Sequence, residues 1–290
     1  MIGVAEGPDE HEFGHVVDAD LAGGRIIVVD AAHARVSVFD TAGKFIRHMG
    51  RVGSGPGEFM RPMSAAVLDS LIAIYDESLA RIIVFDTSGT FRQSAQISTY
   101  LAEDLVAGPS GTILVSSKAD SSARIFHYDL QGRLLRKLVQ PPRAAFRAGV
   151  PELPSGQICS RSQEVVYANP WIYELVLFST ADGERRWSKT WPGALKDLDE
   201  RAAEAAVLPP RGFTLGLHCT GRRAVLATLG LTSGKLFYDF FDSDFNMTGR
   251  MSFSRTSGEF PGFIGGLVGE RMVTFRTKPF SQVFLYRLVE

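Results

Sequence analysis

Hydrophobic and polar positions alternate along this chain in a pattern that repeats. Short apolar runs of β-branched and aromatic residues are bounded by Asp and Gly, which is typical of β-strands and turns. Residues 26–45 recur at a constant offset of 46 as residues 72–91, with IIVVD and RVSVFDTAGKF in the first copy and IAIYD and RIIVFDTSGTF in the second. A repeat of this length, made of short strands, predicts a β-propeller.

Four later copies preserve the strand rhythm with less sequence similarity, so the chain is predicted to be all-β. An aromatic residue closes the second apolar run of every copy: Phe39, Phe85, Tyr128, Phe178, Phe241 and Tyr286. Segments rich in small residues predict the innermost strands, near residues 14–20, 64–69, 103–108, 156–161, 213–219 and 263–268. We expect six blades of four antiparallel strands in a single domain, residues 1–290.

A second element recurs between the repeats. The sequence GSGPGEF at residues 53–59 precedes the second predicted inner strand, and SGEFP at residues 257–261 precedes the sixth. With these linkers, the chain resembles the NHL-repeat family of six-bladed propellers, closely over about residues 1–135 and weakly beyond. The resemblance implies that Asp30 with Arg35, and Asp76 with Arg81, hold loops by ion pairs. It implies no single function, because the family includes lyases, receptors and RNA binders.

The last blade is expected to be incomplete. Ile2-Gly3 aligns with Met49-Gly50, the end of an outermost strand, whereas the sequence stops at the third strand of the sixth repeat. Residues 1–12 should therefore be irregular or only touch blade six, and the run Val283–Tyr286 should expose an unpaired edge. We expect that about ten upstream residues would raise stability, and that a leader or lipoprotein signal could precede Met1.

Composition narrows the classes of partner. The net charge of −1 gives no reason to expect nucleic acid or an anionic membrane, and no apolar run reaches the length of about 20 residues that a membrane span needs. Cys159 and Cys219 fall on predicted inner strands of adjacent blades. Because neighbouring inner strands should diverge, we expect buried free thiols. A periplasmic, extracellular or lipid-anchored location is the working hypothesis, although this chain shows no signal peptide.

Long loops indicate where a ligand could bind. The connections from the fourth strand of one blade to the first of the next (d–a), and from the second to the third strand (b–c), should share one face of the ring. That face would carry residues 51–62, 139–155, 169–173 and 191–212, including a short helix over 195–208. The ligand-binding candidates are Arg51, Arg61, Arg143, Arg147, Arg161, Trp171, Tyr173 and Arg211. Solvated arginines and aromatics packed beneath loops are the alternatives that stay open.

The sequence contains no clear catalytic motif and no clear set of metal ligands. Only His218 of the six histidines falls on an inner strand, so we expect no transition-metal site. Asp18, Asp104 and Asn169 could serve a lactonase-like calcium site, but their spacing does not match. No nucleophile elbow, P-loop or dinucleotide fingerprint occurs.

Three hypotheses follow. The first is a non-catalytic, exported binding propeller, without a cofactor, that recognises a peptide, a glycan or a small anionic ligand on the d–a/b–c face. The second is a metal-assisted lyase or lactonase at the channel mouth, with a divalent ion such as calcium on the axis. The third is a scaffold without a small-molecule site.

Overall fold

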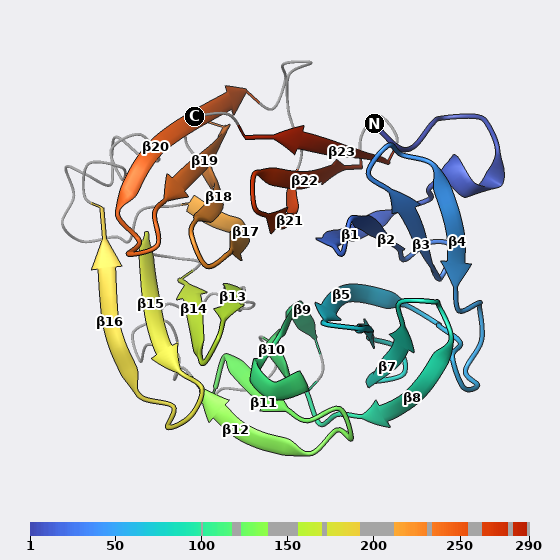
Figure 1. The fold of residues 1–290 in the computed structure, drawn as a ribbon, viewed down its shortest axis with the longest axis horizontal. Coiled ribbons are helices and arrows are strands. Elements are labelled where there is room, and N and C mark those ends of the chain that lie inside the picture. The colour runs from blue at the N-terminus through green and yellow to red at the C-terminus, as the bar shows by residue number, and fades with distance from the viewer. Residues whose placement is uncertain are drawn as a thin grey trace.

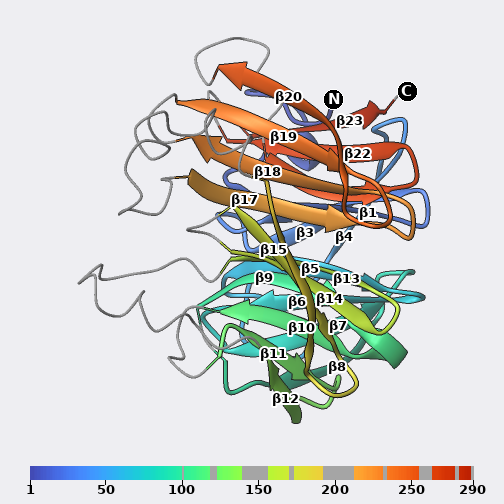
Figure 2. The ribbon, with the colours of Figure 1, turned by 90° about the vertical axis from the view of Figure 1, so that its left-hand side faces the viewer.

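Six antiparallel sheets surround one central axis in chain order (Figure 1). This computed structural model describes residues 1–99, 101–117, 123–138, 156–169, 173–191, 212–230, 234–254, 263–277 and 281–288. Seen from the side, the strands of all the blades run between the same two faces of the ring (Figure 2). The predicted six-bladed β-propeller is therefore confirmed.

Within each blade the strands run from the axis outward in chain order. The first three blades comprise β1 (Val16–Ala22), β2 (Arg25–Asp30), β3 (Arg35–Asp40), β4 (Phe45–Met49); β5 (Pro62–Leu68), β6 (Leu71–Asp76), β7 (Arg81–Asp86), β8 (Phe91–Gln96); and β9 (Ala102–Ala107), β10 (Ile113–Ser117), β11 (Ile125–Tyr128), β12 (Leu134–Leu138). The last three comprise β13 (Gln157–Arg161), β14 (Glu164–Ala168), β15 (Glu174–Ser179), β16 (Arg185–Thr190); β17 (Gly212–Cys219), β18 (Ala224–Gly230), β19 (Lys235–Phe241), β20 (Met247–Ser254); and β21 (Phe263–Val268), β22 (Arg271–Arg276), β23 (Gln282–Arg287). Two short 3-10 helices, η1 (Asp9–His11) and η2 (Pro109–Gly111), accompany them.

The innermost strands lie where the small-residue segments predict them. Strands β1, β5, β9, β13, β17 and β21 each overlap their predicted range, and each contacts the next around the axis. Strand β21 also contacts β1, so the ring is closed. Gly265 allows this approach, because a Cβ atom there would lie 1.8 Å from the carbonyl oxygen of Ala19.

Burial follows the position of each strand in its blade. The residues of β2 and β6 are buried except for the first one, because a neighbouring blade covers each face of these strands. The outermost strand β8 instead alternates between half-buried and exposed residues, since its outer face meets solvent. The hydrophobic clusters accordingly lie between blades; one of them joins β2 and β3 to β6 and β7.

Buried carboxylates at the ends of β2 and β6 hold the incoming linkers. Asp30 accepts hydrogen bonds from the backbone N–H groups of Gly14 (3.0 Å) and His15 (2.9 Å). Asp76 accepts the equivalent bonds from Met60 (2.7 Å) and Arg61 (3.0 Å). Both side chains are fully buried, so these bonds replace the water that each carboxylate loses on folding.

Arg35 and Arg81 grip the same linkers through carbonyl oxygens. Arg81 donates to the carbonyls of Ser54 (3.1 Å), Gly55 (2.8 Å) and Glu58 (2.9 Å). Arg35 likewise donates to Asp9 and Glu12, and its Nε lies 3.9 Å from Asp30. The expected ion pair between Arg35 and Asp30 is therefore present, although long, and both residues of each pair also bind the linker directly. The ion pair expected between Asp76 and Arg81 stays a prediction.

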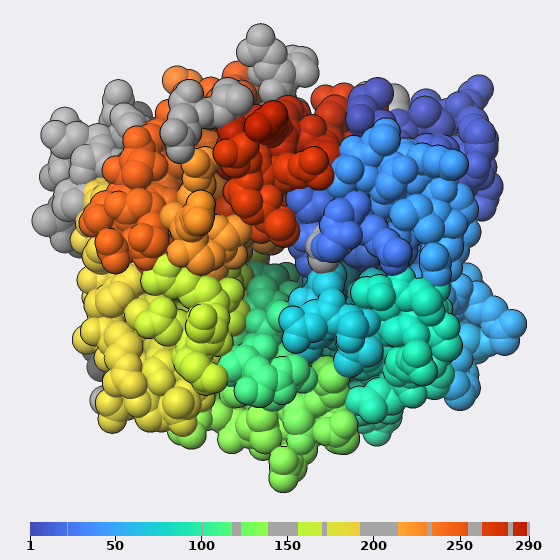
Figure 3. Space-filling view, viewed as in Figure 1, coloured from blue at the N-terminus to red at the C-terminus, as the bar shows by residue number. Residues whose placement is uncertain are grey.

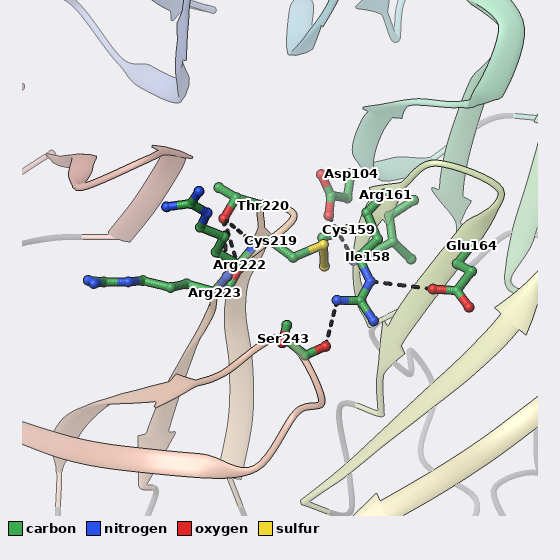
Figure 4. Close-up of a disulfide and its surroundings, with 10 residues drawn as sticks. All are labelled: Asp104, Ile158, Cys159, Arg161, Glu164, Cys219, Thr220, Arg222, Arg223 and Ser243. Carbon is green, nitrogen blue, oxygen red and sulfur yellow. Dashed lines mark hydrogen bonds and ion pairs between the residues drawn. A yellow bond between two sulfur atoms is a disulfide. The ribbon is translucent and has the colours of Figure 1, made fainter.

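Cys159 and Cys219 form a disulfide, so the prediction of free thiols is wrong (Figure 4). The bond joins β13 to β17 across two adjacent blades, with 5.7 Å between the two Cα atoms. Inner strands crowd the axis, and their Cα atoms therefore come within disulfide range instead of diverging.

Blade six has three strands within the described residues, as predicted. The N-terminal segment only touches it: Ile2 pairs with Val283 through two backbone hydrogen bonds of 2.8 Å, and residues 3–12 form no strand. The expected helix over 195–208 lies outside the described residues. The effect of adding upstream residues stays a prediction.

Replacing both cysteines by serine should lower the free energy of unfolding by about 2–5 kcal/mol, because the disulfide closes a long loop in the unfolded chain. The loop spans a sequence separation of 60. Urea denaturation followed by circular dichroism measures the change, with dithiothreitol-treated native protein as the control. Two titratable thiols in unfolded, unreduced protein would contradict the disulfide.

Candidate functional site

The linker between blades one and two is a rigid, well-bonded loop. The Glu58 carboxylate accepts hydrogen bonds from the Gly55 N–H (2.8 Å) and the Arg51 Nε (2.8 Å). The Gly55 bond first, and then Arg51, hold the pKa of Glu58 below its usual range. Glycine suits position 53, because its φ of +150° is one that other residues rarely adopt, and a Cβ atom there would also displace the Glu58 carboxylate from 2.2 Å away.

Buried Phe59 anchors this loop between the two blades. Its N–H donates to the carbonyl of Arg51 (2.8 Å), and its own carbonyl accepts from Gly53 (2.9 Å). The Phe59 ring lies 5.7 Å from the ring of Phe85, inside the core. The loop conformation is therefore set by packing as well as by hydrogen bonds.

The same loop displays a mixed surface that we call the linker patch: Arg51, Val52, Met60 and Arg61. Val52 is 66% exposed and Met60 is 49% exposed, although both are apolar. The side chains of Arg51 and Arg61 are 81% and 58% exposed, and each pairs with a carboxylate at 2.7 Å, Glu58 and Glu77 respectively. One linker thus exposes two apolar side chains and two guanidinium groups that still face solvent.

Arg161 lies on the opposite face, which corrects its sequence-based placement. It ends β13 at the turn between the first and second strands of blade four. Its guanidinium donates to the Ser243 carbonyl at 2.6 Å (Figure 4). It also lies 4.9 Å from the centre of the Phe245 ring. It therefore ties blade four to a turn of blade five.

Tyr173 is only 5% exposed, so the expectation of an exposed aromatic is wrong for this residue. Its hydroxyl donates to the buried carboxylate of Asp239, and its ring packs edge-on against Trp191. Burial raises the pKa of the Tyr173 hydroxyl, with Asp239 as the next cause. The remaining candidates Arg143, Arg147, Trp171 and Arg211 lie outside the described residues. Ligand binding by any of the eight stays a prediction.

A second candidate site is a cavity of about 380 Å³ in the central channel. Asp18, Asp20, Asp104 and His218 line it together with the disulfide and the turns between the first and second strands. The hollow at the ring centre opens between the inner strands (Figure 3). Asp18, Asp104 and His218 lie on inner strands, as predicted. Asp20 was not predicted to be a channel residue, although side chains two residues apart on a strand share one side, which places Asp20 beside Asp18 on β1.

Polar channel residues connect successive inner strands. Asp18 accepts from the Ser64 hydroxyl and the Ala65 N–H, both at 2.9 Å. Asp104 accepts from the Ile158 N–H at 3.0 Å. These contacts tie blade one to blade two and blade three to blade four.

His218 makes the corresponding contact between blades five and six. Its Nε2 lies 3.2 Å from the Ile264 carbonyl. Burial lowers the pKa of His218 to about 4, so the imidazole is neutral at physiological pH and can donate this hydrogen bond.

Burial also controls the charge of the channel carboxyls. It is the largest cause that raises the pKa of Asp18 to about 6, of Asp20 to about 7 and of Asp104 to about 8. Repulsion among the three carboxylates adds to the rise for Asp20 and Asp104. Near neutral pH the channel therefore carries fewer negative charges than its composition indicates.

Within the described ranges, no three His, Cys, Asp or Glu side chains come close enough together to hold a metal ion. The expectations of no transition metal and of an axial calcium ion both stay predictions. Among the same residues, no helix is long and apolar enough to cross a membrane.

The six sheets around one axis define this protein as a six-bladed β-propeller. This architecture supports binding or scaffold roles. Residues 5–135 match the model of the family DUF5128, described as a 6-bladed beta-propeller. The more specific likeness to NHL repeats remains a resemblance. No curated protein matches the sequence.

Solved structures show the same fold at low sequence identity. A Bacteroides fragilis NCTC 9343 protein thought to be exported is 15% identical with a TM-score of 0.67, covering 95% of this chain and 83% of its own. Virginiamycin B lyase from Staphylococcus aureus is 11% identical with a TM-score of 0.55, covering 92% and 78%. A chain of a nidogen/laminin complex is 12% identical with a TM-score of 0.55, covering 82% and 80%. Such identities establish the fold alone.

The raised carboxyl pKa values predict a pH-dependent stability. Between about pH 4 and pH 8 the folded protein binds more protons than the unfolded chain, so the free energy of unfolding falls as pH rises through this window. Asp104→Asn keeps an oxygen acceptor for Ile158 and removes the charge. It should raise the Tm by roughly 2–4 °C at pH 8.5 and have little effect near pH 4.

Calorimetry across this pH range tests the effect. Asp69→Asn is the control, because it removes a carboxylate that is exposed on a turn beside the same cavity. A lower Tm for Asp104→Asn at pH 8.5 would mean that the charged carboxylate stabilises the ring.

Proposed function

We propose that this chain is a non-catalytic binding propeller that acts outside the cytoplasm and recognises a peptide, a glycan or a small anionic ligand on its d–a/b–c face. The linker patch carries this proposal. Neither nucleic acid nor a membrane is the expected partner, since the net charge is only −1.

The composition of the linker patch suits a partner that is both apolar and acidic. Met and Arg are enriched in protein interfaces, and exposed apolar side chains gain free energy when a partner covers them. The guanidinium groups of Arg51 and Arg61 could form charge-assisted hydrogen bonds with carboxylate, sulfate or phosphate groups. Because Glu58 and Phe59 already fix the loop, binding would require little further ordering.

A location outside the cytoplasm is supported by the disulfide between Cys159 and Cys219. Structural disulfides persist in oxidising compartments and are rare in the cytosol. The similar Bacteroides fragilis protein is itself thought to be exported, although this likeness alone shows only the fold.

Substituting the apolar half of the linker patch should weaken ligand binding. Peptides from a displayed random library and a panel of anionic oligosaccharides serve as probes, and binding is measured by calorimetry. Val52→Ser with Met60→Ser should weaken binding by roughly tenfold or more, while the Tm changes by only a few degrees. Arg51→Ala with Arg61→Ala should weaken the binding of anionic probes most.

Leu134→Ser with Leu135→Ser is the matched control, because these leucines are exposed on β12, away from the patch. Probes that bind all three variants and the native protein equally would contradict a role for the linker patch.

The channel favours a second candidate function, a metal-assisted lyase or lactonase with calcium on the axis. Three buried carboxyls line one cavity, which is the observation that supports it. Because they do not lie close enough together to ligate one ion as placed here, calcium binding would require these side chains to converge. If this function holds, calorimetric titration at pH 9 should detect a calcium site that Asp18→Asn with Asp104→Asn removes and Asp69→Asn retains. Equal heats from all of these proteins would exclude an axial calcium site.

A further inference from the structure

The disulfide between Cys159 and Cys219 lies in the wall of the central channel. Both cysteines line the channel cavity of about 380 Å³. Cys219 ends β17 and is only partly buried, whereas Cys159 is 4% exposed. Cys219 is therefore the cysteine that a small molecule in the channel reaches first.

The cavity is open to solvent at the turns that connect the first and second strands of the blades. Gly23 and Asp69 lie on two of these turns, and Val268 lies beside a third. All three line the cavity and are exposed. Figure 3 shows the hollow at the ring centre. A small thiol such as cysteamine can therefore enter from solvent and approach the disulfide.

Blades four and five do not depend on the disulfide alone. Buried apolar residues of both blades form one core cluster, which includes Leu177 of blade four and Phe241 of blade five. Arg161 also donates to the Ser243 carbonyl across the same seam (Figure 4). Because these contacts do not involve sulfur, we expect the ring to stay folded when the disulfide is reduced.

The charge of the cavity favours some thiols over others. Asp18, Asp20, Asp69 and Asp104 line it, and none of the described residues that line it is Lys or Arg. Burial raises the pKa of Asp18 to about 6, of Asp20 to about 7 and of Asp104 to about 8, so these three carboxyls are ionised at pH 9. Carboxylates at the channel mouth attract a thiol that carries an ammonium group and repel one that carries a carboxylate.

We propose that the bond between Cys159 and Cys219 is a thiol–disulfide exchange site at the channel mouth, which small cationic and neutral thiols reduce in the folded protein. A thiolate attacks the Sγ of Cys219, the sulfur–sulfur bond breaks, and Cys159 leaves as a thiolate that takes up a proton. This activity goes beyond ligand binding by the linker patch, which lies outside the channel, so the two can be tested separately.

A second thiol molecule completes the reduction. Its thiolate attacks the sulfur that the first molecule brought, and Cys219 leaves as a thiolate and is protonated. Two small thiols are thus oxidised to one small disulfide, and the protein gains two thiols. No metal ion or further oxidant takes part.

Cysteamine and 3-mercaptopropionate are the probes, each added to residues 1–290 at pH 9 and low ionic strength. Each rate is divided by the rate of the same thiol on hydroxyethyl disulfide, which corrects for intrinsic reactivity. The corrected rate should be at least roughly tenfold higher for cysteamine, because the channel carboxylates attract its ammonium group. Salt at about 1 M should reduce this ratio by screening.

Alkylation followed by mass spectrometry counts the thiols, while circular dichroism follows the fold. Equal corrected rates for the two thiols at low salt would overturn the proposal. A rate that does not depend on thiol concentration would also overturn it, because unfolding would then precede reduction. Loss of the cooperative thermal transition after reduction would contradict a folded reduced ring.

Two pairs of substitutions test the role of the channel charge. Asp20→Asn with Asp69→Asn should lower the ratio of corrected rates by roughly threefold or more. Glu184→Gln with Asp244→Asn is the matched control, because it removes two exposed carboxylates from turns between third and fourth strands. Equal ratios for the two double variants would overturn the charge argument. Asp69→Asn alone keeps the test available if the first pair fails to fold, since Asp69 is exposed.

Peptide mapping after partial reduction identifies the sulfur that is attacked. Acid quenching followed by alkylation should place cysteamine on Cys219 and the alkyl group on Cys159. The reverse distribution would overturn the assignment of Cys219 as the point of attack.

Discussion

Buried carboxylates that accept backbone N–H groups are the interaction on which this ring depends. Asp30 and Asp76 each end a second strand and bind the linker that leads into their own blade. A buried charge is tolerated only when hydrogen bonds replace its hydration, so the linker must take one conformation for the blade to be stable. The conformation of the linker is therefore coupled to the packing of the sheets. Two residues of the linker patch, Met60 and Arg61, are held by their backbone bonds to the buried Asp76.

Much of the fold could be predicted from the sequence, because its repeats are local and periodic. The offset of 46 fixed the strands of blades one and two, and the small-residue segments located all six inner strands to within about two residues. Contacts between blades were harder to predict. The pairing of Cys159 with Cys219 depends on how tightly inner strands crowd the axis, which no single repeat encodes.

The candidate site was predictable only in part. Arg51 and Arg61 lie on the expected linker, but Arg161 lies at the opposite end of its strand, which the alternating direction of the strands could have indicated. The burial of Tyr173 depends on Asp239, which lies on a third strand one blade later. The cavity between blades five and six is likewise lined by residues of both blades. The sequence predicts an exposed edge at Val283–Tyr286, but it does not predict which apolar residues of blade five lie beside that edge.

The disulfide also determines where the ring can come apart. Blades four and five are connected covalently twice, by the chain and by the sulfur–sulfur bond. Among the described residues, blade six meets blade one through non-covalent contacts, such as the Ile2–Val283 pair and the approach of Gly265 to Ala19. Under heat or mechanical load, blades four and five should therefore stay tethered to each other even after the non-covalent contacts between them are lost.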